Sequence, residues 1–231
     1  MKVPGLLILL AASASAAPWK EIFKPMASWE AAASVTAEDT AIRFEKDPDG
    51  KFFTNASNPK KAGYLQTAEA FGDCTVEAEF MIPAGSNSGI YLMGRYEIQI
   101  LDSHGKDKVG SSDMGGVYQR WDNQRQPKGF EGVAPSENAA NPPGEWQTMV
   151  IRFRAPRFDA DGKLLEKPRF LSVTLNGKLV QQNVTLSGPT RAAQRKGFVA
   201  RDAVFIQGDH GPIAFRKFKV TPENFDAKPE E

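Results

Sequence analysis

Residues 86–102 bring several kinds of polar side chain into one short stretch of the chain. With the two-residue period of a β-strand, Arg95, Glu97 and Gln99 share one face, and the apolar residues between them share the other. A guanidinium, a carboxylate and an amide in one row suit a ligand that is rich in hydroxyl groups. The same pattern also fits an outer strand face in contact with water, so the sequence leaves both interpretations open.

Three side chains are candidates for acid–base catalysis. Glu97 is the first candidate for a general base, although it could instead pair with Arg95 two residues away. Asp102, where the expected strand ends, could orient a base, bind a metal or cap the following loop. His210 could act as an acid, a base or a metal ligand, because histidine titrates near neutral pH. His104 is a weaker candidate, since turn composition alone explains the segment around it.

A second group of side chains could contact a sugar. Arg95 and Gln99 can hydrogen-bond to hydroxyl groups, and aromatic rings can stack on a sugar face. The alternative for each aromatic residue is core packing, which we favour for Trp146, and Asn87 could equally form a turn. Arg216 could reach the site or tie the sheets together, and we favour the structural role. The candidate substrate-binding residues are Asn87, Tyr91, Arg95, Gln99, Tyr118, Trp121 and Gln207.

The chain that positions these residues reads as a succession of short strands. With 16 prolines, 20 glycines and no alternation of strands and helices, it predicts an all-β protein, an antiparallel sandwich or jelly roll. The one helical pattern lies near residues 28–33. Strands are expected at residues 64–67, 74–82, 89–93, 95–101, 116–119, 147–154, 170–176, 178–182, 203–207 and 213–220.

Turn residues divide these strands. Asn176-Gly177 predicts a two-residue hairpin turn, and residues 49–50 and 161–162 mark further turns. The long segments 106–115 and 120–144 follow the polar-faced strands and are expected to wall a site. Residues 155–167 are expected to form a surface hairpin extension.

The N-terminus has the pattern of an export signal. A basic residue is followed by an apolar run and by Ala14-Ser15-Ala16, which fits a cleavage site. The apolar run is shorter than the ~20 residues that span a bilayer. We therefore expect residues 1–16 to be a signal peptide, residues 17–231 to form one domain, and the protein to be periplasmic or extracellular.

Charge and cysteine content exclude several classes of function. The formal net charge is +1, so bulk charge gives no attraction for nucleic acid or anionic lipid. The single cysteine, Cys74, has no partner for an intramolecular disulfide. It alternates with apolar residues, which predicts a buried thiol without a chemical role.

A series of motifs, in order along residues 18–220, resembles one known family. The matching segments are residues 63–67 (GYLQT), 71–80 (FGDCTVEAEF), 87–102 (NSGIYLMGRYEIQILD), 116–118 (GVY), 142–147 (PPGEWQ), 173–177 (VTLNG) and 206–218 (IQGDHGPIAFRKF). In this order they resemble the 3-keto-disaccharide hydrolase domain family. The chain departs from the family at Gln147 and Lys217, where Asn is usual, and Gly208-Asp209 adds a residue before His210.

The resemblance implies a concanavalin-like jelly roll of two curved antiparallel sheets. It also implies an exported enzyme whose substrate is an oxidised disaccharide or glycoside with a ketone at C3. Such a ketone acidifies the C2 proton, so a base can remove it and the C1 oxygen can leave by β-elimination. Water addition to the enone completes a net hydrolysis, and without it the enzyme is a lyase.

A divalent metal would suit this chemistry, because it would polarise the C3 ketone. The sequence has no compact ligand motif such as H-x-x-x-H, so a metal site would have to be assembled from separate strands and loops. We therefore assign no metal ligands.

Three other functions stay open at this point. An ordinary concanavalin-like glycoside hydrolase wants carboxylates at alternating positions of one strand, but here an amide and an apolar residue follow Glu97. A non-catalytic carbohydrate-binding module could use the same polar row to hold a glycan. A structural envelope protein is a weaker interpretation, because the polar row would have no purpose in it.

Overall fold

The computed structural model describes residues 19–226, so the expected signal peptide lies outside the described residues. The described chain begins with the four-residue helix α1 (Trp19–Ile22) and is otherwise built from strands and loops. In this part of the chain no helix is long and apolar enough to cross a membrane.

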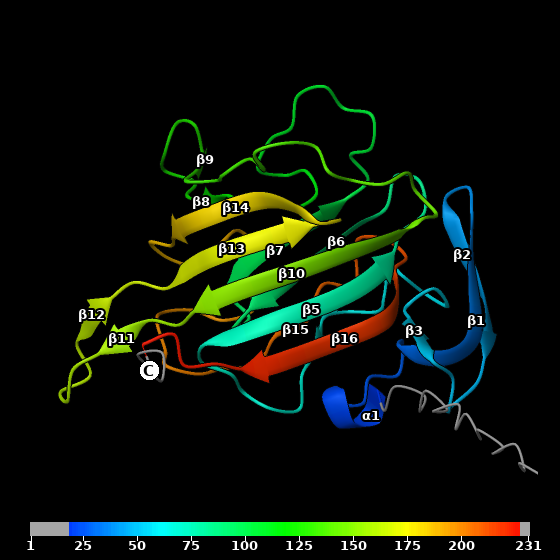
Figure 1. The fold of residues 1–231 in the computed structure, drawn as a ribbon, viewed down its shortest axis with the longest axis horizontal. Helices are drawn as coiled ribbons and strands as arrows, with labels where there is room; N and C mark the ends of the chain where they lie inside the picture. Colours follow the sequence, from blue (N-terminus) through cyan, green and yellow to red (C-terminus); the bar gives the residue numbers. More distant parts are fainter. Residues whose placement is uncertain (1–18, 227–231) are drawn as a thin grey trace, which may run out of the picture.

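The larger sheet has eight strands, and every neighbouring pair is antiparallel. Its order is β14 (Lys178–Thr185), β13 (Arg169–Leu175), β10 (Trp146–Arg154), β5 (Cys74–Met81), β16 (Ala214–Pro222), β3 (Phe52–Thr54), β1 (Glu30–Glu38) and β2 (Ala41–Lys46). Figure 1 shows this sheet across the front of the molecule. Its last strand in the chain, β16, lies beside β5, which comes from the first half of the chain.

The smaller sheet has four antiparallel strands and lies behind the larger one in Figure 1. Its order is β4 (Leu65–Gln66), β15 (Phe205–Ile206), β6 (Asn87–Leu92) and β7 (Tyr96–Leu101). Two small hairpins extend the fold: β8 (Arg120–Trp121) with β9 (Gly129–Phe130), and β11 (Arg157–Phe158) with β12 (Leu164–Glu166). The second is the surface hairpin expected at residues 155–167.

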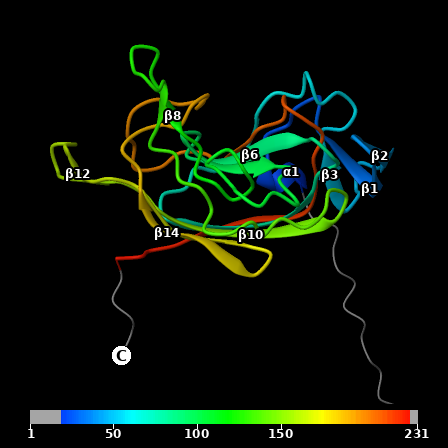
Figure 2. The ribbon, with the colours of Figure 1, turned by 90° about the horizontal axis from the view of Figure 1, so that it is seen from above.

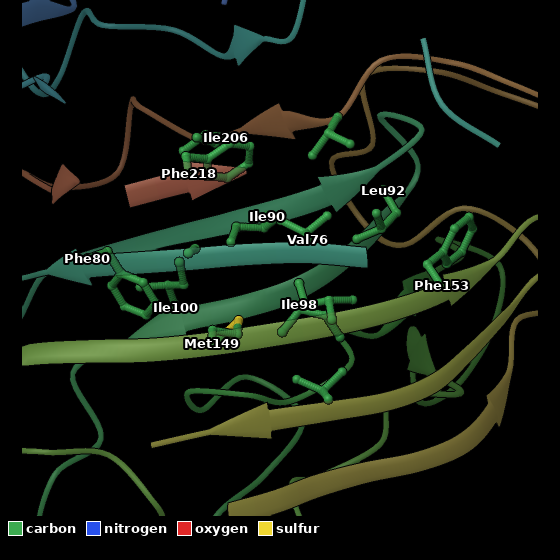
Figure 3. Packing of buried hydrophobic residues seen from close by; sticks show 14 of the residues in the cluster. Val76, Phe80, Ile90, Leu92, Ile98, Ile100, Met149, Phe153, Ile206 and Phe218 are labelled. Carbon is green, nitrogen blue, oxygen red and sulfur yellow. The ribbon is translucent and has the colours of Figure 1, made fainter. Parts of the chain in front are cut away.

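The core fills the space between the two sheets. Alternate residues of β5 and β10, among them Phe80 and Met149, point into it from the larger sheet, and Ile98 and Ile100 enter it from β7 (Figure 3). Because side chains alternate along a strand, residues 97 and 99 must face the other way. The predicted division of β7 into two faces is therefore confirmed, and so is the all-β jelly roll of two antiparallel sheets.

Most predicted strands are present with small shifts at their ends. Residues 116–119 are the exception, because this segment joins the edge of β7 only through a bridge from Val117 to Ile98. The Asn176-Gly177 hairpin is confirmed: both residues have positive φ, 50° and 79°, and Leu175 pairs with Lys178. Cys74 is buried as predicted, and burial raises the pKa of its thiol to about 12.

The helix predicted near residues 28–33 is wrong. Residues 30–33 begin β1, which pairs with β2 on one side and with β3 on the other, so that Ala32 lies between Lys46 and Phe52. Three alanines in a row favour a helix locally, but the strand partners that make this segment part of the sheet lie elsewhere in the sequence. β2 and β3 were not predicted either.

Candidate functional site

A cavity of about 280 Å³ lies on the face of the smaller sheet that points away from the core. Figure 2 shows β6 above β10 of the larger sheet, with the loop that carries β8 on the far side of β6. The cavity is lined by Asn87, Tyr91, Glu97, Gln99, Tyr118, Arg191, Ala192, Gln207 and His210. Seven of the sequence-predicted site residues therefore meet in one place: Asn87, Tyr91, Glu97, Gln99, Tyr118, Gln207 and His210.

Glu97 sits in the middle of paired backbone. Tyr91 of β6 is its cross-strand partner, and on the other side the Tyr118 amide donates to the Glu97 carbonyl at 3.1 Å. The Glu97 amide donates to Oγ1 of Thr190 at 3.3 Å. Glu97 is therefore held from both neighbouring segments, and its side chain has a fixed direction.

Gly89 makes room for the Glu97 carboxylate. A Cβ atom at position 89 would lie 3.0 Å from both Cγ and Cδ of Glu97, and closer still to Oε1. Real Cβ atoms do not approach other atoms so closely. The carboxylate thus rests directly on the backbone of β6, which only a glycine permits.

Glu97 is buried without a cation. Its exposed fraction is 1%, its Oε2 atom has no hydrogen-bond partner, and it belongs to none of the ion pairs of residues 19–226. Burial raises the pKa of its carboxyl to about 8, with the nearby Tyr91 hydroxyl opposing the shift. The polar row is therefore not a solvated strand face, and Glu97 is a candidate for a group that exchanges a proton near neutral pH.

Two further polar groups in the cavity lack a protein partner. Gln99 donates to Oδ1 of Asn87 at 2.9 Å, but its own Oε1 is unpaired, and so is the Tyr91 hydroxyl. Buried polar groups are nearly always hydrogen-bonded in folded proteins. With Oε1 of Gln99, the Tyr91 hydroxyl and Oε2 of Glu97 all lacking a hydrogen-bond partner, this wall is suited to a ligand that brings its own hydroxyl groups.

A tyrosine outside the cavity lining supports this wall. The ring of Tyr64 meets Tyr91 edge-on with centroids 5.5 Å apart, and its hydroxyl accepts from Nε2 of Gln207 at 3.0 Å. Burial raises the pKa of both tyrosines, so their hydroxyl groups stay protonated and can donate. Tyr64 was part of a recognised motif but not among the predicted site residues.

His210 reaches the cavity from the turn at residues 208–211. Asn55 fixes this turn, because its amide donates to the carbonyls of Gly208 at 2.8 Å and Gly211 at 2.9 Å. The His210 ring is half exposed, and its Nδ1 lies 2.6 Å from Oδ1 of Asp209. The residue added at Gly208-Asp209 therefore does not turn His210 away from the site.

Arg191, which was not predicted from the sequence, brings a positive charge to the rim of the cavity. Its guanidinium lies 4.0 Å from the ring centroid of Trp121, and its amide donates to the Gln119 carbonyl at 2.8 Å. Trp121 itself is 39% exposed and is not part of the lining. Nothing in the local sequence around Arg191 marks it, because its place depends on a loop contact across more than seventy residues.

Arg95 and Asp102 lie outside the cavity lining. The Arg95 guanidinium is 4% exposed, pairs with Asp202 at 2.7 Å, and donates to the carbonyl of Gly197 at 2.9 Å. Oδ2 of Asp102 accepts from the Gly85 amide at 2.9 Å and so holds the loop before β6. The row of three predicted from the strand period is split, since Arg95 stands just before β7 begins and turns toward the loop at residues 196–202.

The weaker candidates, His104 and Arg216, make contacts with other residues outside the cavity lining. His104 is exposed, with Nδ1 3.1 Å from the carbonyl of Ala140. Arg216 lies over the ring of Trp146 at 4.5 Å and pairs with Glu79 at 2.6 Å. Within residues 19–226 no group of three or more His, Cys, Asp or Glu side chains is placed to hold a metal ion, and we assign no ligands.

Comparison with known proteins places the chain in a family. Residues 18–221 match the model of the 3-keto-alpha-glucoside-1,2-lyase-like domain. The chain belongs to this family. The family expected from the sequence motifs is thereby confirmed, and the matched residues contain every side chain that lines the cavity.

Solved structures share the fold. A candidate glycosyl hydrolase from Parabacteroides distasonis ATCC 8503 is 26% identical with a TM-score of 0.60, over 85% of this chain and 79% of its own. A second from the same organism is 17% identical with a TM-score of 0.51, over 84% of this chain and 99% of its own. No curated protein sequence matches the chain.

Proposed function

We propose that this protein is an exported enzyme that cleaves 3-keto-glycosides by removing the C2 proton and eliminating the C1 oxygen. Its family and the 26% identical candidate glycosyl hydrolase support a carbohydrate-active role. The observation that carries the specific proposal is Glu97, a buried carboxylate without a cation whose pKa is raised to about 8. It lies in a cavity whose unpaired polar groups suit a sugar.

The reaction begins with proton transfer to Glu97. The carboxylate takes the proton from C2, and the electron pair of the C–H bond moves toward the C3 ketone, giving an enediolate. In the second step this electron pair forms a C1–C2 double bond while the bond from C1 to the leaving oxygen breaks. The leaving oxygen takes up a proton, and water can then add to the enone.

The other cavity residues have roles that follow from the donor and acceptor groups that they bring to the cavity. The Tyr91 hydroxyl and the Arg191 guanidinium are donors that can stabilise negative charge on the C3 oxygen. Oε1 of Gln99 can accept a hydrogen bond from a sugar hydroxyl. His210, on the exposed side, is the candidate to give a proton to the leaving oxygen.

An ordinary glycoside hydrolase fits the cavity less well. Such enzymes need two carboxyl groups flanking the bond that is cleaved. Glu97 is the one carboxylate among the described residues that line the cavity. A base acting on an acidified C–H bond needs only one.

The experiment is incubation with 3-keto-trehalose and 3-keto-cellobiose, with and without a chelator, while free sugar is measured. The unoxidised disaccharides are the control. We expect release from an oxidised substrate only, and loss of release in Glu97→Gln. If the wild type releases nothing, and both it and the Glu97→Gln variant bind the oxidised disaccharides equally well, the protein is a binding module and the proposal is wrong.

Export is a separate part of the proposal, supported by the pattern of residues 1–16. N-terminal sequencing of the protein from the periplasm or medium of an expressing bacterium tests it. The expected N-terminus is Ala17, and recovery only from the cytoplasm with Met1 intact would contradict it.

A further inference from the structure

A second cavity, of about 320 Å³, adjoins the first. Tyr118 lines both cavities, Thr190 lines the second, and Arg191, the next residue in the chain, lines the first. Thr190 also accepts a hydrogen bond from the Glu97 amide. The second cavity therefore shares Tyr118 with the first, and Thr190 connects its wall to the backbone of Glu97.

Its lining combines fixed polar groups with apolar walls. Nη1 of Arg120 donates to Oγ of Ser187 at 2.6 Å and to Oε2 of Glu131 at 3.2 Å, and Ser187 also donates to Glu131. The Arg120 guanidinium lies 4.9 Å from the Phe130 ring centroid, which adds a cation–π contact to these hydrogen bonds. The Arg120 and Glu131 side chains are 31% and 50% exposed, so they can still meet a ligand.

The lining suits a neutral, hydroxyl-rich ring. Charged and hydroxyl groups that converge beside buried aliphatic side chains give a ligand both hydrogen bonds and an apolar surface. The charges of Arg120 and Glu131 offset each other, so the cavity offers no net attraction for an ion. A disaccharide whose oxidised ring lies at Glu97 has to place its second ring beside the first.

We propose that this second cavity binds the sugar ring that leaves when the C1–O bond breaks, and thereby sets the preference for a disaccharide over a glycoside with a small aglycone. The inference rests on the proposed function for the placement of the oxidised ring. It assigns Arg120, Ser187 and Glu131 to substrate preference and not to the chemical steps.

The test uses Gly188→Val, which fills the second cavity. A Cβ atom at position 188 would lie 2.8 Å from Cζ of Arg120, and the side chain that it meets is flexible. The control is Gly110→Val, where a Cβ atom would come no nearer than 3.9 Å to any residue beyond its two chain neighbours. Neither glycine has a positive φ. Glu131→Gln is a second variant, which changes the polar wall with little change in volume.

The substrates are 3-keto-cellobiose and methyl 3-keto-glucoside. In Gly188→Val we expect kcat/KM to fall about tenfold or more for the disaccharide and to stay within about twofold for the methyl glycoside. Glu131→Gln should shift the same preference in the same direction, and Gly110→Val should not. Equal losses on both substrates in the folded variants, or no loss on either, would overturn the inference.

A binding measurement distinguishes failure of this inference from failure of the proposed function. Calorimetry with Glu97→Gln as the parent measures the affinity for both compounds without turnover. If the wild type cleaves neither compound nor 3-keto-trehalose, the proposed function is wrong, but weaker binding of the disaccharide alone in Glu97→Gln/Gly188→Val still supports the second cavity as a sugar site. Unchanged binding of both compounds overturns it.

Discussion

Glu97 is unusual because its carboxyl group is buried without a counter-charge. Most buried acids in proteins pair with a cation, which keeps them ionised and inert as bases. Here the nearest cation of the row, Arg95, pairs instead with Asp202 and several carbonyls. Glu97 is left with a pKa raised to about 8, which is the property expected of the proposed base.

The pH dependence of activity follows from this pKa. A base works only when ionised, so in a His210→Asn variant, which removes the candidate acid, kcat/KM for a 3-keto-disaccharide should rise about tenfold per pH unit below pH ~8 and level off above it. Initial rates between pH 5 and 9.5 measure this. A profile that is flat across pH 6–8, with the protein folded throughout, would show that the Glu97 carboxyl is not the base.

Gly89 is predicted to matter through the space that it leaves. Gly89→Ala places a methyl group against the Glu97 carboxylate, which must move off the backbone of β6. Because small displacements of a catalytic group are costly, we expect about a 10²-fold loss in kcat/KM. Gly110→Ala is the matched control, since its Cβ has room. Wild-type rates in Gly89→Ala would mean that the position of the carboxylate does not matter.

β7 and its neighbours decide which side chains reach the site. The two-residue period of β7 predicts that residues 97 and 99 share a face, and the structure confirms this part. The period could not predict that Arg95 turns toward the loop at residues 196–202, because a strand pattern holds only inside the strand. Arg191 and Tyr64 reach the site through contacts between distant segments, and no local pattern carries that information.

Arg95 is predicted to act as an anchor for a loop and not as a ligand for substrate. Arg95→Leu removes the ion pair to Asp202 and the bonds to Gly197 and Met93, so the free energy of unfolding should fall by about 2–3 kcal/mol. Urea denaturation measures this loss. The KM of the folded variant should change less than about threefold. A large rise in KM with unchanged stability would show instead that Arg95 contacts the substrate.

Dependence on distant segments also explains why the helix predicted near residues 28–33 is wrong and why β2 and β3 were not predicted. The segment at residues 28–33 is rich in alanine and reads as a helix, but β2 and β3 supply hydrogen-bond partners that make it a strand. The Asn176-Gly177 hairpin, whose turn depends on the two residues themselves, was predictable. A turn can be predicted from its own residues, whereas the partner of a strand depends on segments that are distant in the sequence.

The molecule as a whole keeps stability and chemistry on opposite faces of one sheet. The smaller sheet turns Ile98 and Ile100 into the core, and turns Glu97 and Gln99 to the cavity. The motif order along the chain was sufficient to predict the family and the jelly roll. It did not predict the second cavity, whose walls come from the β8–β9 hairpin and residues 185–190.

The raised pKa of Glu97 also makes the stability of the whole molecule depend on pH. In the folded state Glu97 holds its proton up to pH ~8, but in the unfolded state it loses it near 4.5. Between these values the folded state binds more protons, so the contribution of Glu97 to stability falls as pH rises, by about 1.4 kcal/mol per unit.

Glu97→Gln removes this dependence, because glutamine does not titrate. The unfolding free energy of the variant minus that of the wild type should therefore increase between pH 5 and pH 8. Denaturant titrations of both proteins at several pH values provide the measurement, and other groups cancel in the difference. A difference that is constant with pH would show that the pKa of Glu97 is not raised in the folded protein.

The most direct test of proton removal by Glu97 is cleavage of 3-keto-cellobiose in D₂O. If the base takes the C2 proton and water then adds to the enone, the released 3-keto-glucose carries deuterium at C2, or the enone itself accumulates. Glu97→Gln should form neither product above the rate without enzyme, and 3-keto-glucose kept in D₂O alone corrects for spontaneous exchange. Cleavage that leaves the original hydrogen at C2, or that proceeds equally fast in Glu97→Gln, would contradict this account.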